Sequence, residues 1–191
     1  MNDPTKFVFS AVMISILAAC GKSSEVPEGP IASQIENNQT PPLQVPASLV
    51  PAQGGATSLD MQKLADLVAN KAPCSLDLIA GKSIVSGPIS LITGSDILFQ
   101  GWISNPDLQS PGTIAVLLSG EQAYAFRGSA GGARPDVAKI LKADGLVKSG
   151  FNVSSKLVNV APGEYSVSLI QDWAGSTIQC PTKAKITVTA L

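Results

Sequence analysis

Three cysteines and no histidine decide which side-chain chemistry this 191-residue chain offers. Without histidine it has no Ser-His-Asp or Cys-His arrangement for nucleophilic catalysis and no His-ligated zinc. It also lacks a Ser-x-x-Lys motif. The glycine-rich run at 128–132 lacks the Gly-Lys-Ser/Thr ending of a phosphate-binding loop, so we expect a flexible loop there. The thiols of Cys20, Cys74 and Cys180 and the carboxylates remain to be explained.

Carboxylates alone are sufficient for one class of enzyme, because a glycosidase needs only two acids about 5 to 9.5 Å apart. The candidates are Asp77, Asp96, Asp107, Asp136 and Asp172. Asp96 follows Gly94-Ser95, however, and Asp144 precedes Gly145, which are positions where aspartate favours a turn. No Asp-x-Asp-x-Asp-Gly loop is present for calcium. We therefore expect no metal and no cofactor, and an enzyme is the alternative hypothesis.

Cys20 follows a segment with the three parts of a secretion signal. Residues 1–19 contain Lys6, an apolar run of about thirteen residues and small residues at the end. The run is shorter than the ~20 apolar residues that a membrane-spanning helix needs. Leu17-Ala18-Ala19-Cys20-Gly21 resembles the lipobox of bacterial lipoproteins. The resemblance implies removal of residues 1–19, acylation of Cys20 and attachment to a membrane. It favours the outer membrane, because Gly21 rather than Asp follows the cysteine.

Export places Cys74 and Cys180 in an oxidising compartment, where two free thiols tend to pair. A redox or metal site of the Cys-x-x-Cys type is the alternative, but the two residues lie far apart and no imidazole can assist them. We expect one disulfide that closes a loop of roughly 100 residues. The net charge of −1 argues against nucleic acid as a partner, because such proteins carry a basic patch.

The chain changes character along its length. Residues 20–56 are rich in proline and polar residues and are predicted to form a disordered tether. For 57–73 we predict an amphipathic helix, because Thr57-Ser58-Leu59-Asp60 can form a capping box. Apolar residues then recur at helical spacing, at Met61, Leu64, Ala65 and Val68.

From residue 74 to 191 the pattern has period two, which is typical of half-buried strands. We predict strands over 75–79, 84–92, 97–104, 113–119, 122–127, 151–160, 165–171, 176–180 and 185–189. One short helix interrupts them over 136–144, with Pro135 at its first position and Asp144-Gly145 at its end. The fold class is therefore all-β, with strands spaced as in a sandwich.

Five short fragments in this region resemble Ig-like β-sandwich modules of bacterial envelope proteins. They are Cys74-Ser75-Leu76-Asp77, Gly101-Trp102, Arg134-Pro135-Asp136-Val137-Ala138, Gly150-Phe151 and Pro162-Gly163-Glu164-Tyr165. The resemblance implies an antiparallel Ig-like sandwich over 74–191. It also implies that the hydroxyl of Tyr165 bonds to the backbone just upstream, as in a tyrosine corner.

Two residues are candidates for ligand contact. Arg134 can either bind a ligand or pin the inserted helix to the sandwich, and we favour the second role. Trp173 lies at a predicted hairpin tip and is the best candidate for an exposed ring, although a packed ring is the more common outcome for tryptophan. We hypothesise a lipid-anchored, non-enzymatic module that binds or scaffolds envelope glycan or protein. The alternative is a carboxylate-dependent enzyme, or an accessory domain, acting on envelope polysaccharide.

Overall fold

The computed structural model describes residues 48–50, 55–69 and 71–191. The signal segment 1–19 and Cys20 lie outside the described residues. The elements are β1 (Ala56–Leu59), 3-10 helix η1 (Met61–Asp66), β2 (Val68–Ala69), β3 (Cys74–Ile79), β4 (Lys82–Ser83), η2 (Ile84–Ser86), β5 (Ile89–Ile92), β6 (Asp96–Ile103), β7 (Thr113–Ser119), β8 (Ala123–Gly132), α1 (Pro135–Leu141), η3 (Asp144–Leu146), β9 (Gly150–Lys156), β10 (Gly163–Trp173) and β11 (Ser176–Thr189). Across these residues, no helix is long and apolar enough to cross a membrane.

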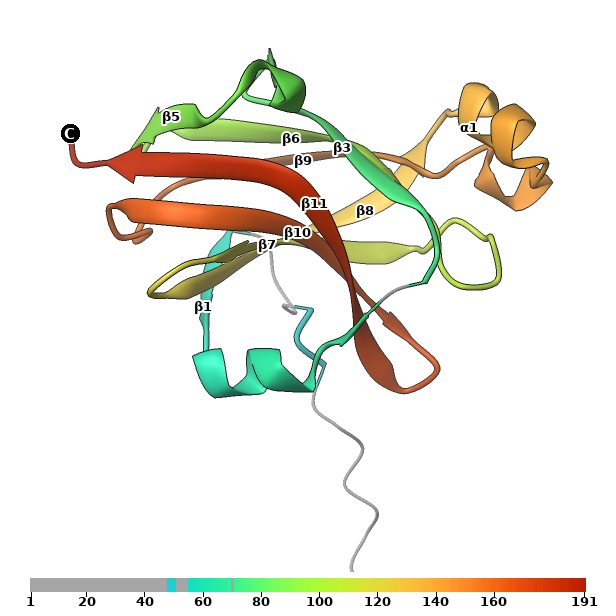
Figure 1. Cartoon of the computed structure of the whole chain (residues 1–191), viewed down its shortest axis with the longest axis horizontal. Helices are drawn as coiled ribbons and strands as arrows, with labels where there is room; N and C mark the ends of the chain where they lie inside the picture. Colours follow the sequence, from blue (N-terminus) through green and yellow to red (C-terminus); the bar gives the residue numbers. More distant parts are fainter. Residues whose placement is uncertain (1–47, 51–54, 70) are drawn as a thin grey trace, which may run out of the picture. The chain divides into compact units, whose positions relative to one another are not determined.

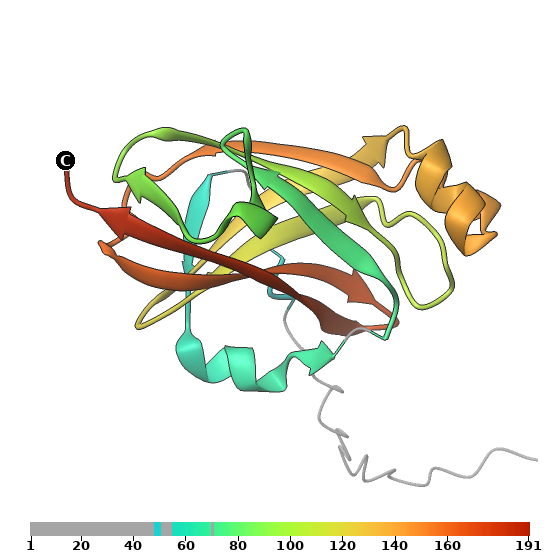
Figure 2. The same ribbon diagram turned by 45° about the horizontal axis from the view of Figure 1, so that its top comes forward.

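The strands form one mixed sheet that curls on itself. The hydrogen-bonded path runs β2-β11-β10-β7-β8-β9-β6-β3-β4, with β1 beside β8 and β5 beside β11. Among the described strands, β2 and β5 run parallel to their partner β11, and the other pairs are antiparallel. The path turns along β8, because its first part pairs with β7 whereas Ala130 and Gly132 pair with β9. Figures 1 and 2 show β3 and β11, from the two ends of the path, lying close together. The prediction of an all-β fold is confirmed.

The main core fills the inside of the curl. Along β6 the side chains alternate, so that Ile97, Phe99 and Ile103 are buried while Gln100 and Trp102 are only half-buried. In this core the ring centroids of Phe99 and Phe126 lie 5.6 Å apart. Period-two alternation in the sequence therefore reports a sheet with one covered face, as expected for antiparallel strands.

A second apolar cluster covers the outer face of β7, β8 and β10. It joins Leu49 and Val50 to Ala115, Leu117 and Ile170. Leu49 N also donates a hydrogen bond to Thr177 Oγ1 at 3.1 Å. The predicted tether over 20–56 therefore extends too far, because Leu49, Val50 and Ala56 belong to the folded domain. In the sequence, the unbroken apolar run over 114–118 indicates that this strand is covered on both faces, since a strand buried on both faces loses its alternation.

The helix predicted over 57–73 is wrong in type and length. Thr57 and Ser58 belong to β1, which pairs with β8, and they are therefore unavailable as helix caps. A 3-10 helix of six residues follows, with the Asp60 side chain accepting a hydrogen bond from Gln62 N. Leu64 in this helix and Leu67 just after it pack on the second cluster, whereas Met61 and Val68 are exposed.

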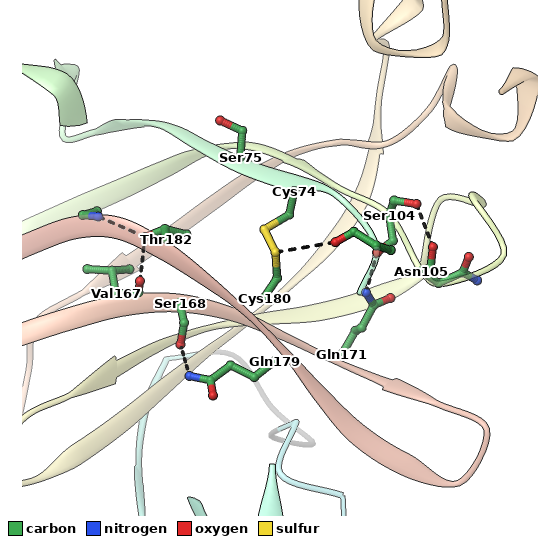
Figure 3. The surroundings of a disulfide bond; sticks show 12 residues. Cys74, Ser75, Ser104, Asn105, Val167, Ser168, Gln171, Gln179, Cys180 and Thr182 are labelled. Carbon is green, nitrogen blue, oxygen red and sulfur yellow. Dashed lines mark hydrogen bonds between the residues drawn. A yellow bond between two sulfur atoms is a disulfide. The ribbon is translucent and has the colours of Figure 1, made fainter. Parts of the chain in front are cut away.

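The predicted disulfide is confirmed. Cys74 at the start of β3 and Cys180 in β11 are bonded across 106 positions of sequence. Figure 3 shows the bond joining these two strands, which lie near opposite ends of the sheet path. Beside it the buried Gln171 Nε2 donates a hydrogen bond to Ser104 O at 2.8 Å (Figure 3). The bond closes the curl covalently.

Several strand boundaries differ from the prediction. The strand predicted over 84–92 begins only at Ile89, because 84–86 form η2, and the strand predicted over 151–160 ends at Lys156. The glycine-rich run at 128–132 is not a loop but the second part of β8. Gly128 is required there, because an added Cβ would lie 2.3 Å from Val153 Cγ2. The two strands predicted over 176–180 and 185–189 are one strand, β11, and its pairing with β10 shifts register between Ser166 and Ser168, next to Pro181. A register shift accommodates proline within a sheet, where its missing N–H breaks the ladder.

Candidate functional site

A shallow cleft of about 290 Å³ opens between β3, β6, β9 and the start of α1. Its polar lining comes from Asp77 on β3, Gln100 on β6, Asn152 on β9 and Arg134 just before α1. Gln100 and Asn152 are direct neighbours across the β6–β9 pair. The cleft therefore lies on the outer, half-exposed face of the sheet, with its side chains fixed by strand register.

Arg134 is held between two carboxylates. Its Nη1 donates to Asp77 Oδ2 at 3.0 Å, and its Nε and Nη2 donate to the Asp136 carboxylate at 3.0 and 2.9 Å. Ser75 Oγ donates to the other oxygen of Asp77 at 2.6 Å. The hydrogen bond with Asp136 raises the pKa of Arg134, and the same contact lowers the pKa of Asp136. Arg134 thus links α1 to β3, which is the pinning role favoured for it.

Local backbone structure places the guanidinium. Pro135 occupies the first turn of α1, and Arg134 N donates to Val147 O at 2.7 Å, which ties the start of the helix to the chain after η3. The stem of Arg134 lies over Gly150, where an added Cβ would come 3.0 Å from Arg134 Cγ and 2.9 Å from Gly132 O. Glycine at position 150 is therefore a steric requirement for this placement.

The neutral part of the cleft is an amide pair. Gln100 Nε2 donates to Asn152 Oδ1 at 3.0 Å. This leaves the Gln100 carbonyl as an acceptor and the Asn152 amide as a donor on the same surface. Trp102 lies two residues beyond Gln100 on the same face of β6, and it packs against the small cluster of Val137, Ala138 and Leu146 under α1.

Four of the five fragments that carry the resemblance meet at this cleft. Asp77, Gly101, Arg134 and the pair Gly150-Phe151 all line it, although they are spread over more than seventy positions of sequence. Gly101 is required under β3, because an added Cβ would lie 2.1 Å from Ser75 O. Four fragments that are distant in the sequence therefore lie together in one place in space.

Trp173 does not line this cleft. It ends β10 at the predicted hairpin tip, where Ala174 and Gly175 both have positive φ. The ring is half-buried, and its Nε1 donates to Asp107 Oδ2 at 3.2 Å. The ring is therefore tied to the loop between β6 and β7.

The candidate carboxylates are distributed over four places. Asp77 and Asp136 share Arg134, Asp107 binds Trp173, and the others face different partners. Asp96 lies 3.5 Å from Lys156 Nζ, and Asp172 accepts from Thr177 Oγ1 at 2.7 Å and from the Ser48 hydroxyl. Within the described ranges, no group of three or more Cys, Asp or Glu side chains is arranged to hold a metal ion.

Comparison with known proteins identified no matching family model, no matching curated protein and no matching solved structure. Sequence reasoning missed Gln100 and Asn152, which carry no motif of their own. Only their positions in the sequence could have indicated them, because both are polar residues at outward-facing strand positions next to the fragments Gly101-Trp102 and Gly150-Phe151.

Proposed function

We propose that this chain is a lipid-anchored protein of the bacterial cell envelope whose domain is a non-enzymatic binding or scaffolding module for envelope glycan or protein. Acylated Cys20 attaches it to a membrane, with the outer membrane favoured by Gly21. The observation that carries the binding role is the cleft between β3, β6 and β9, where polar side chains on rigid strands surround a guanidinium already bound by carboxylates. Because the charged groups in this cleft are already paired with one another, they are better suited to recognising a ligand than to transferring protons.

We further propose that the curled sheet is an Ig-like β-sandwich. In that fold strands A, B and E pair in one sheet and C, F and G in the other. The pairs β3–β6, β6–β9, β7–β10 and β10–β11 support this assignment, since they correspond to A–B, B–E, C–F and F–G in chain order. Here β8 pairs with both β7 and β9 and so joins the two sheets.

A tyrosine at the start of β10 gives independent support. Tyr165 Oη donates to Ala161 O at 2.7 Å, four residues upstream, as the resemblance implied. In Ig-like domains a tyrosine near the start of strand F makes a bond of this kind. Here Tyr124 accepts from Ala161 N at 3.1 Å, and the two rings pack edge to face with their centroids 5.9 Å apart.

Anchoring is tested by labelling growing cells with palmitate and separating their membranes on a density gradient. We expect label in the native chain and none in Cys20→Ala, which should leave the membrane fraction. The matched variant Gly21→Asp retains Cys20 and should keep the label but move to the inner membrane. An unlabelled native chain, or equal pelleting of native and Cys20→Ala chains without label, contradicts the proposed anchor.

The enzyme alternative makes a different prediction. If Asp77 served as a catalytic acid or base, incubation with envelope polysaccharide would generate new reducing ends, and Asp77→Asn would abolish them. The binding proposal predicts no reducing ends from either chain. Turnover that Asp77→Asn removes, while the melting temperature stays unchanged, would replace the binding proposal with the enzyme.

A further inference from the structure

We propose that the cleft lined by Asp77, Gln100, Arg134 and Asn152 binds an uncharged glycan. This inference rests on the proposed binding function and names the class of ligand for its site. Three properties of the cleft favour such a ligand, namely its charge, its hydrogen-bonding groups and its neighbouring aromatic ring.

The charge of the cleft disfavours acidic ligands. Among the residues that line it, Arg134 is the only cation, and each of its three nitrogen atoms already donates to Asp77 or Asp136. Two carboxylates around one guanidinium leave a local charge of about −1. A guanidinium has five N–H groups, so an anion could still reach Arg134, but the two neighbouring carboxylates would repel a phosphate or uronic acid and leave it little net attraction. An uncharged ligand avoids this repulsion.

The hydrogen-bonding groups suit hydroxyls. The Gln100–Asn152 pair presents an acceptor next to a donor, and Asp77 adds a carboxylate whose side chain is 41 % exposed. A sugar hydroxyl both donates and accepts, so neighbouring hydroxyls can pair with such an alternating surface. Strand pairing fixes the amides, and Ser75 and Arg134 fix the carboxylate before any ligand arrives. This preorganisation reduces the entropy lost on binding.

An aromatic ring lies one step along the same strand face. Residues two apart on a strand are separated by about 6.6 Å, so half-buried Trp102 is adjacent to Gln100. Its contacts with Val137, Ala138 and Leu146 fix the ring in place. The apolar face of a sugar can pack on such a ring while its hydroxyls reach the amides. A cleft volume of about 290 Å³ is small for a ligand pocket, so it would hold a short part of a longer chain.

The test uses the full chain carrying Cys20→Ser, which removes the acylation site and leaves the domain intact. We would measure its affinity for neutral hexasaccharides (cellohexaose, maltohexaose and chitohexaose) and for acidic hexagalacturonate by calorimetry. In ¹⁵N-labelled protein, the neutral ligand that binds should shift the side-chain amide signals of Gln100 and Asn152. Asn152→Ala should weaken binding about 5-fold, and adding Gln100→Ala should weaken it about 5-fold more, since a hydrogen bond contributes about 1 kcal/mol.

The matched control is Ser166→Ala with Thr187→Ala, two polar residues at a different cleft of similar volume on β10 and β11. This control should leave the affinity unchanged. The inference is overturned if no neutral hexasaccharide binds, if hexagalacturonate binds more tightly, or if the Gln100 and Asn152 variants bind as well as the control. Binding of an envelope protein at this cleft, with no glycan bound, would overturn the inference and leave the proposed function standing. Absence of palmitate on Cys20 would refute the anchor without affecting the glycan site.

Discussion

Removal of the Cys74–Cys180 bond should destabilise the domain more than Tyr165→Phe or Gly128→Ala. A cross-link spanning 106 positions restricts the unfolded chain, and loop-closure entropy at that length corresponds to about 4.7 kcal/mol at 25 °C. Domains of this size have a total stability of about 5 to 15 kcal/mol. The reduced chain should therefore retain little stability, and its melting temperature should fall by roughly 15 °C.

The assay is urea unfolding at 25 °C, followed by the fluorescence of Trp102 and Trp173, with and without a reducing agent. A Cys20→Ser background leaves only the two paired thiols. Cys74→Ala with Cys180→Ala provides the control, because it removes the bond permanently and should match the reduced chain to within about 1 kcal/mol, apart from lost sulfur packing. Hydrogen exchange should rise most along β3 and β11, which the bond connects.

One result would refute this reasoning. If the oxidised and reduced chains differed by less than about 1 kcal/mol, the unfolded ensemble would already hold β3 near β11, and loop entropy would not describe it. A reduced chain that is unfolded without urea is consistent with the expected size of the effect, provided that the native state returns on reoxidation.

Four further predictions, at three residues, concern stability. Tyr165→Phe removes the bond to Ala161 O and should lower the unfolding free energy by about 1 kcal/mol in urea. Because burial raises the pKa of Tyr165 above 10.0, native stability should decline as pH rises beyond 10, and the melting temperature of Tyr165→Phe should decline less. The hydrogen bond with Arg134 lowers the pKa of Asp136, so ionised Asp136 stabilises the folded domain above pH 3.8, and this contribution is lost as the pH falls through its folded pKa. In Asp136→Asn the melting temperature should therefore fall less steeply at acid pH. Gly128→Ala should cost about 1 to 3 kcal/mol through overlap with Val153, whereas Gly112→Ala, with no atom near its Cβ, should melt like the native chain.

The sequence was sufficient for features that depend on local pattern. Alternation along β6 predicted a strand with one buried face, and two remaining thiols in an exported chain predicted the pairing of Cys74 with Cys180. Along β10 the predicted alternation holds only at its start, because Ser168 and Ile170 on the expected wet face are buried as well. Features that depend on tertiary contacts were missed. The sequence around Thr57 and Ser58 is typical of a helix cap, but these residues pair with β8 and therefore form a strand. The run at 128–132 read as a loop, because glycine signals flexibility unless a partner such as Val153 is known to pack against it.

In the candidate site, too, local pattern indicated some residues and only tertiary contacts brought in the others. Arg134 stood out because it precedes a helix start, and its pinning role followed from charge and position. Asp77 was one of five scattered carboxylates until β3 placed it 3.0 Å from Arg134. Gln100 and Asn152 lie 52 positions apart, and only the register of β6 with β9 makes them a pair. Pairing register between distant strands is not encoded in any local pattern.

The disulfide also determines how the domain would respond to mechanical load. If Cys20 is anchored and the cleft holds a glycan, tension enters the fold at Ser48 and leaves through Asp77, Gln100 and Asn152. Only about 26 residues precede Cys74 from that entry point, so stripping Leu49 and β1 from the sheet would lengthen the connection by at most about 90 Å. Beyond Cys74, the covalent loop to Cys180 encloses every cleft residue. Once the segment over 48–73 had yielded, the disulfide would divide the load at Cys74 between β3 and β11, so these two strands could not separate at that point.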